Sequence, residues 1–246
     1  MLLREELEKQ GGWLFGRRSY FLLFSIPLLL FAFADSSNSK LTLGGVGDQL
    51  YNCACIVLSF FGFTIRCITV AHLPKRTSGR STTEQIAESL NTTGMYSIHR
   101  HPLYFGNFII YLGMILSVQV WWFTAIMVLV VFFYLERIML VEERFLLEKF
   151  GTPYIEWARV TPAYWPRFRI WRQDRLPFSM RNVLKREYSG FFAIIVAYTV
   201  FEMLRNFVHG SLSLGVGWLV FLNIGLLIYV FLRILRKRGY LDVEGR

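Results

Sequence analysis

The fold is decided by the stretch PLYFGNFIIYLGMILSVQVWWFTAIMVLVVFFYL, which runs from Pro102 to Leu135 without one Asp, Glu, Lys or Arg. A helix needs about 20 mostly apolar residues to cross the hydrocarbon core of a bilayer, so this stretch has room for two short crossings. Unpaired backbone amides are costly in lipid, and both crossings must therefore be helical. The sequence predicts a helical membrane hairpin here.

The composition of the whole chain agrees with a membrane protein. Of its 246 residues, 54% are hydrophobic and 18% are charged. A soluble domain usually carries about 25% charged residues, so ordinary soluble and disordered classes are excluded. We predict an all-α integral membrane protein with about six transmembrane helices: Tyr20–Ala34, Asp48–His72, Leu103–Val120, Phe123–Leu135, Phe191–Val208 and Leu212–Leu232.

The basic residues predict the orientation of the chain. There are 27 Lys and Arg against 17 Asp and Glu, and ten of the 27 lie between Glu142 and Ser189. The positive-inside rule then places both termini and the juxtamembrane segment 142–189 on the cytoplasmic side. The stretch Trp165–Arg172 is rich in aromatic residues and arginine, which suits an anionic lipid surface, and no nucleic-acid partner is expected.

The front of the chain has two interpretations. Arg17 and Arg18, followed by an apolar run that ends near Ala34, resemble a cleavable secretion signal, but we expect a retained helix. We divide the chain into N-terminal membrane helices at 1–72, a core with the site at 73–175, and a two-helix membrane extension at 176–246.

A first polar cluster precedes the hairpin, where residues 94–107 read GMYSIHRHPLYFGN. Proline is favoured in the first turn of a helix, so Pro102 predicts a helix start with His101 at the cap. The unpaired amides of that start, together with Arg100, indicate a site for a carboxylate. Tyr104 would add a hydroxyl, and Gly106 an open backbone against which a planar ring could pack.

A second polar cluster follows the hairpin at Glu142 and Glu143. At 3.6 residues per turn these side chains point about 100° apart, so they are not expected to form an acid/base pair. We expect one to face a bound cation and the other an arginine or solvent, and Gly151 and Pro153 to end the helix. Because the hairpin returns to one membrane edge, the two clusters would hold the opposite ends of a zwitterion, such as the amino-acid part of S-adenosylmethionine.

The combined pattern resembles the isoprenylcysteine carboxyl methyltransferase and phospholipid methyltransferase family. The resemblance rests on the Arg-His-Pro helix start, the glutamate pair and the motif FGTPYIEWARVTP at 150–162, and it covers roughly Pro74 to Arg167. It implies that Arg159 lies near the methyl acceptor as a catalytic residue, with Tyr154 and Arg137 as further candidates. It also implies S-adenosylmethionine as cofactor, bound by Tyr96, Arg100, His101, Pro102, Leu103, Tyr104, Gly106, Glu142 and Glu143.

The chemistry leaves the acceptor open. Methyl transfer from a sulfonium needs positioning rather than a metal, and Cys53, Cys55 and Cys67 are spaced for packing, so no metal is expected. The basic segment favours an acidic acceptor on a lipid or lipidated substrate, either a lipid phosphate or a prenylcysteine-type carboxylate. The alternative is the amine of a lipid such as phosphatidylethanolamine, whose proton would need a base, for example His99 or His101.

A different class of protein also fits part of the sequence. Arg66, Glu202 and Arg205 lie inside predicted spans, and charges within a membrane often line a transport pathway. A transporter or non-catalytic membrane scaffold is therefore the competing interpretation, unless Glu202 and Arg205 pair with each other. The sequence leaves the oligomeric state open.

Overall fold

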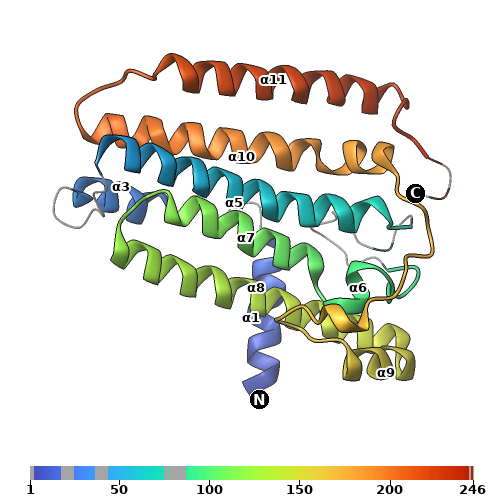
Figure 1. Cartoon of the computed structure of the whole chain (residues 1–246). Coiled ribbons are helices and arrows are strands. Elements are labelled where there is room, and N and C mark those ends of the chain that lie inside the picture. Colours follow the sequence, from blue (N-terminus) through green and yellow to red (C-terminus); the bar gives the residue numbers. More distant parts are fainter. Residues whose placement is uncertain are drawn as a thin grey trace.

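The computed structural model describes residues 3–17, 25–36, 44–74, 77, 87–243 and 245, and these residues form helices without a β-strand. The predicted all-α fold is thus confirmed for the described part. In Figure 1 the long helices lie side by side in the spatial order α11 (Val216–Lys237), α10 (Met180–Val208), α5 (Gly45–Ala71), α7 (Pro102–Leu116) and α8 (Trp121–Phe150).

Shorter helices lie around this bundle (Figure 1). Helix α1 (Leu3–Arg17) crosses beside α8, and α3 (Ile26–Ala34) lies at one end. The other end, which we call the α6 end, carries three short elements: α6 (Met95–Ile98), α9 (Thr152–Val160) and the 3₁₀ helix η2 (Phe168–Ile170). The residues of the two predicted polar clusters lie at this α6 end.

Four of the described helices, α5, α8, α10 and α11, are long and apolar enough to cross a membrane. Helix α7 is apolar but has only 15 residues, which corresponds to about 22 Å. Several apolar helices are thus consistent with a multi-pass membrane protein, but the predicted count of six is not confirmed. The first predicted span, Tyr20–Ala34, lies partly outside the described residues.

Two helices extend further than predicted from the apolar stretches. Helix α8 continues past Leu135 to Phe150, and α10 begins at Met180 rather than at Phe191. The predicted spans ended at the first charged residues; the early start of α10 was not predicted, whereas the end of the α8 helix at Gly151 agrees with the prediction. As a result, α8 carries Glu142 and Glu143 on the same continuous helix as its apolar part.

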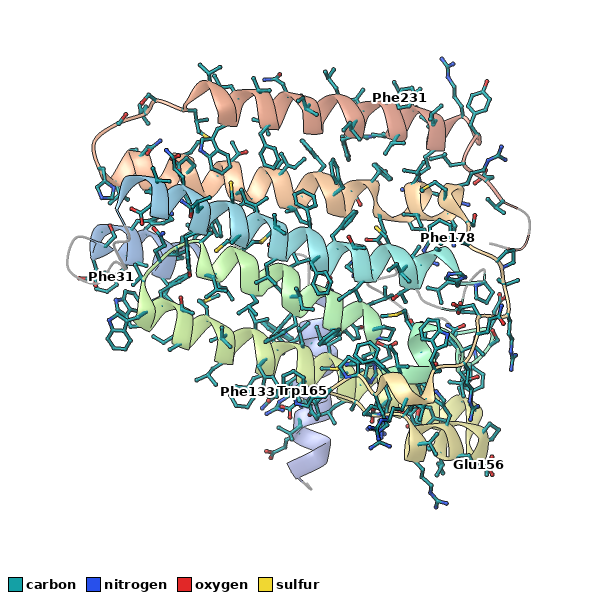
Figure 2. All side chains as sticks on the ribbon, viewed as in Figure 1. Phe31, Phe133, Glu156, Trp165, Phe178 and Phe231 are labelled. Atoms are coloured by element: carbon teal, nitrogen blue, oxygen red, sulfur yellow. The ribbon has the colours of Figure 1, made fainter. Side chains whose placement is uncertain are left out.

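Small residues bring α5 and α7 close together. A Cβ added to Gly106 would lie 2.8 Å from the carbonyl oxygen of Gly62, and Ser59 donates a hydrogen bond of 2.9 Å to the carbonyl of Ile110. Such contacts let membrane helices pack backbone against backbone. The outer faces are apolar and exposed, as Phe231 on α11 shows in Figure 2. Because α5 and α7 pack closely, α5 fixes the position at which α7 begins at the α6 end.

Candidate functional site

The segment 94–101 is bound through its backbone to the segment that follows α9. Gly94 donates to the carbonyl of Arg172 at 2.8 Å, and Arg100 donates to that of Pro162 at 2.9 Å. Gly94 has a φ of +56°, and a Cβ there would collide with the carboxylate of Asp174. Glycine is thus required at this turn, both for its backbone conformation and for the missing side chain.

His99 is buried and both of its ring nitrogens are engaged. Nδ1 accepts a hydrogen bond from the backbone amide of His101 at 2.9 Å, and Nε2 donates to the carbonyl of Tyr164 at 3.0 Å. This pattern requires the neutral ring, and burial lowers the pKa of His99 to about 4. His99, a candidate base in the amine alternative, holds the loop in this structure.

The Arg100 side chain binds the end of α9 and does not face an open anion site in this structure. Its Nε and Nη2 each donate at 2.6 Å, to the carbonyls of Thr161 and Ala158. Its Nη1 lies 3.1 Å from Oε1 of Glu143. In this structure the donors of Arg100 satisfy carbonyls at the end of a helix, which lack partners of their own, and the contact of Arg100 with a ligand carboxylate stays a prediction.

The two predicted polar clusters meet at the start of α7. His101 is the N-cap residue of that helix and Pro102 lies in its first turn, as predicted. The Nε2 of His101 lies 3.1 Å from the same Oε1 of Glu143 that Arg100 contacts. Glu143 therefore joins the tip of α7 to α8, and the side chain of the N-cap residue His101 makes no hydrogen bond to the amides of that tip.

Glu142 occupies a different position from its neighbour. Among the described residues it has no hydrogen bond or ion pair, and it lies within electrostatic range of Tyr96 and Tyr154. The Tyr154 hydroxyl is buried and lacks a hydrogen-bond partner in the described part of the chain. Burial and the nearby Glu143 raise the pKa of Tyr154. A carboxylate and a phenol that can still accept partners are thus present at one place.

Gly106 is packed rather than open. A Cβ at this position would lie 2.6 Å from Cγ of Arg66 and 2.8 Å from the carbonyl oxygen of Gly62, so α5 occupies the space expected for a planar ring. Tyr104 packs against the apolar core, with its ring 5.9 Å from that of His101. The carbonyl of Leu103 accepts a hydrogen bond of 3.4 Å from Arg66. These three residues support the tip of α7 in this structure.

Neither Arg137 nor Arg159 pairs with Glu143 in this structure. Arg137 pairs with Glu136 at 2.6 Å, and its backbone carbonyl lies against Gly11 of α1. Arg159 is exposed on the outer face of α9, the side on which Glu156 lies in Figure 2, whereas Tyr154 is on the buried face. Of the three residues predicted near the acceptor, the structure brings only Tyr154 to the cluster.

The prediction missed a polar network that lies further along α7 than His101, at Asn107. Arg66 donates to both carboxylate oxygens of Glu187, at 2.9 and 3.0 Å, and to Oδ1 of Asn107 at 2.8 Å. The network joins α5, α7 and α10, and with them all three predicted segments of the chain. Arg66 was noticed as a charge within a span. Glu187 was not, because the sequence places it in a juxtamembrane segment.

Comparisons with known proteins agree with the predicted resemblance. Residues 52–153 match the phospholipid methyltransferase family. The nickel-cobalt-cadmium resistance protein NccN of Alcaligenes xylosoxydans xylosoxydans is 28% identical over 127 residues, which are 52% of this chain and 57% of that protein. The cobalt-zinc-cadmium resistance protein CzcN of Cupriavidus metallidurans is 36% identical over 86 residues, which are 35% of this chain and 39% of that protein.

The alignments cover only part of each protein. The chain spans between about two fifths and three fifths of the length of these two relatives, and no solved structure matches it. The family match contains both the start of α7 and the glutamate pair of α8. The predicted relation to the phospholipid methyltransferase family is thereby confirmed for residues 52–153 of this chain.

Proposed function

We propose that the protein transfers the methyl group of S-adenosylmethionine to the polar head of a lipid or lipidated acceptor in the membrane. One observation carries the proposal: His101 and Glu143 touch at 3.1 Å within the segment that matches the methyltransferase family. This contact places the Arg-His-Pro helix start beside the glutamate pair. The distribution of basic residues supports a cytoplasmic position for this end of the bundle.

The residues at the α6 end fit the charges of the cofactor. The carboxylate of Glu142, which has no ion-pair partner among the described residues, would bind an ammonium group. The tip of α7, whose N-cap side chain does not bond its amides, would bind a carboxylate through them. The buried Tyr154 hydroxyl would gain the hydrogen-bond partner that it lacks. S-adenosylmethionine supplies an electrophilic methyl group on a sulfonium.

The protein's own residues would mainly position the reactants. Arg100 and His101 hold Glu143, so the tip of α7 and the end of α8 keep a fixed separation. Holding reactants in place can contribute several kcal/mol to a displacement reaction. An anionic acceptor oxygen forms the new O–C bond as the S–C bond of the donor breaks and its electron pair stays on sulfur. No proton needs to move in that reaction.

An acidic acceptor is our first choice, and an amine is the alternative. An amine must lose a proton, and a neutral His99 that already accepts a hydrogen bond at Nδ1 and donates one at Nε2 is poorly suited to take it. The segment after α9 exposes Trp165 and Phe168 among its arginines, which suits the surface of an anionic membrane. Both features favour O-methylation of an acidic lipid head.

The competing interpretation as a transporter or scaffold loses part of its support. Arg205 pairs with Glu202 at 3.2 Å, and Arg66 pairs with Glu187. The charges within the spans are therefore engaged with one another. The two relatives are named for resistance to metal ions; among the residues that the structure describes, no three His, Cys, Asp or Glu side chains are grouped to hold a metal ion.

The test uses the full chain in lipid nanodiscs with methyl-labelled S-adenosylmethionine and a membrane lipid extract. We expect a labelled lipid whose methyl label is released by base, as from a methyl ester. A labelled lipid that is stable to base would indicate N-methylation. The variant Glu142→Gln should lose labelling, whereas Glu148→Gln, an exposed residue paired with Arg144, should keep it. A wild-type protein that neither binds S-adenosylhomocysteine nor labels any lipid would contradict the proposal.

A further inference from the structure

The segment that follows α9 is bound along its length to the loop before α7. We call residues 162–175 the strap. Five hydrogen bonds of 2.8 to 3.0 Å join it to segment 94–100, and each uses a backbone group of the strap, at Pro162, Tyr164, Arg167 or Arg172. The strap therefore holds the loop with its backbone, and this pairing does not use the strap's side chains.

The side chains of the strap are exposed, basic and aromatic. Its exposed arginines are Arg167, Arg169, Arg172 and Arg175. None of their guanidinium groups has a hydrogen bond or an ion pair with a residue that the structure describes. Asp174, the single acidic residue of the strap, lies 3.6 Å from His72. Trp165 and Phe168 are 79% and 74% exposed. Unpaired arginines beside exposed aromatic rings suit an anionic lipid surface.

The strap lies against the exposed face of α8 where the apolar part of that helix ends. The ring of Tyr164 stacks on that of Phe132, with their centres 5.8 Å apart, and its hydroxyl donates to Oε1 of Glu136 at 3.3 Å. Figure 2 shows the next residue, Trp165, beside Phe133 of α8. Both phenylalanines are exposed on a helix long enough to cross a membrane, and Glu136 is the first charged residue after its apolar part. Aromatic rings are enriched at this boundary between hydrocarbon and water, so the strap lies at the level of the lipid headgroups.

We propose that the strap docks on anionic phospholipid headgroups of the bilayer and that this docking orders the cofactor site. Lipid that binds the strap in its paired arrangement also favours the arrangement of segment 94–100 to which the strap is bound. That segment leads directly into His101, which contacts Glu143. The inference rests on the proposed function for its cofactor, and adds that the surrounding lipid regulates the affinity of the same site. By linkage, the cofactor and the anionic lipid strengthen each other's binding.

The first experiment tests docking and requires neither cofactor nor activity. The full chain is placed in nanodiscs of phosphatidylcholine alone, or of phosphatidylcholine mixed with phosphatidylglycerol, and backbone hydrogen exchange is followed by mass spectrometry. In the anionic nanodiscs we expect exchange to be about fivefold slower, or more, both in the strap and in segment 94–101. Equal exchange of the strap in the two kinds of nanodisc overturns the docking. Slower exchange of the strap without a change in segment 94–101 overturns its coupling to the site.

A pair of double variants assigns the effect to the strap. Arg167→Gln with Arg169→Gln removes two of its charges and should abolish the difference between the nanodiscs. The control is Lys237→Gln with Arg238→Gln, which removes the same charge from exposed residues where α11 ends, at the same end of the bundle (Figure 1), and should keep the difference. Equal behaviour of the two double variants overturns the role of the strap. Should the strap variant melt at a lower temperature, wild type at high ionic strength decides, because salt screens the attraction to the lipid and should also abolish the difference.

The second experiment separates this inference from the proposed function. The affinity of wild type for S-adenosylhomocysteine should be about fivefold higher, or more, in the anionic nanodiscs, and the strap variant should bind it equally in both. Equal affinity of wild type in the two kinds of nanodisc overturns the regulation by lipid and leaves the methyltransferase proposal standing. Wild-type protein whose strap and loop are protected by anionic lipid, but which binds S-adenosylhomocysteine in neither nanodisc, overturns the methyltransferase proposal and supports the docking.

Discussion

Two arginine–glutamate pairs connect the helices of this protein, and they do so in different surroundings. The inner pair, Arg66 with Glu187, joins α5, α7 and α10, and the Glu187 side chain is 3% exposed. The outer pair, Arg100 with Glu143, joins α8, α9 and the loop before α7, and the Glu143 side chain is 26% exposed. Each arginine also donates to acceptors other than its glutamate.

The difference in exposure assigns different roles to the two pairs. In the inner pair water cannot replace a lost partner, so removal of one charge leaves the other uncompensated. In the outer pair water can reach the carboxylate, and the neighbouring Glu142 is the residue that we propose for the ligand. The inner pair should therefore determine the stability of the bundle, and the outer pair the local order and binding at the α6 end.

The largest effect is expected from Glu187→Gln. This change keeps the size of the side chain but leaves the guanidinium of Arg66 without its countercharge, which should lower the free energy of unfolding by about 3–5 kcal/mol. Denaturant unfolding in detergent micelles would measure it. The control is Glu148→Gln, which removes one partner of an exposed ion pair with Arg144 and should cost about 0.5 kcal/mol or less.

A double variant sharpens this test. Arg66→Met with Glu187→Met removes both charges at once, and apolar replacement of a buried pair is often close to neutral. Most of the stability lost in Glu187→Gln should return. If Glu187→Gln is as stable as Glu148→Gln, the inner pair does not stabilise the bundle.

The second largest effect should separate the adjacent glutamates. Glu142→Gln removes the carboxylate proposed for the ammonium of the cofactor, and a charged hydrogen bond contributes about 1.5–3 kcal/mol, so affinity for S-adenosylhomocysteine should fall about tenfold to hundredfold. The melting temperature should stay unchanged. Glu143→Gln should instead speed hydrogen exchange in segment 94–101, because the shared acceptor of Arg100 and His101 loses its negative charge. Equal effects of the two variants would refute this division of roles.

The sequence predicted the features that short-range signals encode. Pro102 placed the start of α7 with His101 at its cap, and Gly151, with a φ of +56°, ends α8 as expected. The uncharged hairpin predicted that the two polar clusters meet, and His101 contacts Glu143. Each of these depends on a residue type at one position or on the length of one apolar stretch.

The features that the sequence did not predict depend on distant partners. Glu187 contacts Arg66 across 121 residues, and its charged neighbours made the first turns of α10 resemble a loop. Arg100 binds backbone carbonyls at the end of α9, which any residue type provides. The exposure of Arg159 follows from the turn of α9, whose buried face is formed by Tyr154 and Trp157. Family motifs indicate that such a residue matters, but not in which direction it points.

The third prediction returns to the inner pair through Gly106, over which the Arg66 side chain passes. A Cβ at this position would lie 2.6 Å from Cγ of Arg66 and 2.8 Å from a backbone oxygen, so Gly106→Ala must displace α7 or the arginine. Overpacking of this kind costs about 1–3 kcal/mol. The control is Gly217→Ala on α11, where no atom lies near the added methyl. Thermal unfolding should show a loss for the first variant only, and equal melting temperatures would contradict the close α5–α7 contact.

The smallest effect tests His99, which holds the loop next to the outer pair, through the pH dependence of stability. The pKa of His99 is about 4 in the folded protein, below its ordinary value of 6.5. Between these values the unfolded chain binds a proton that the folded protein does not, so stability falls as the pH is lowered from 6.5 toward 4. At pH 5.5 the loss attributable to His99 should be about 1.4 kcal/mol relative to pH 8.

His99→Asn isolates this contribution, because the asparagine amide offers an acceptor near the position of Nδ1 and does not titrate. The variant should lose some stability at pH 8, since it lacks the hydrogen bond from Nε2 to Tyr164. Its stability should then change less than that of wild type between pH 8 and pH 5.5. If the stability of wild type and that of His99→Asn change in parallel with pH, His99 does not hold the loop as a neutral ring. The order of the α6 end would then depend on its other contacts, such as the Arg100–Glu143 pair and the backbone hydrogen bonds of Gly94 and Arg100.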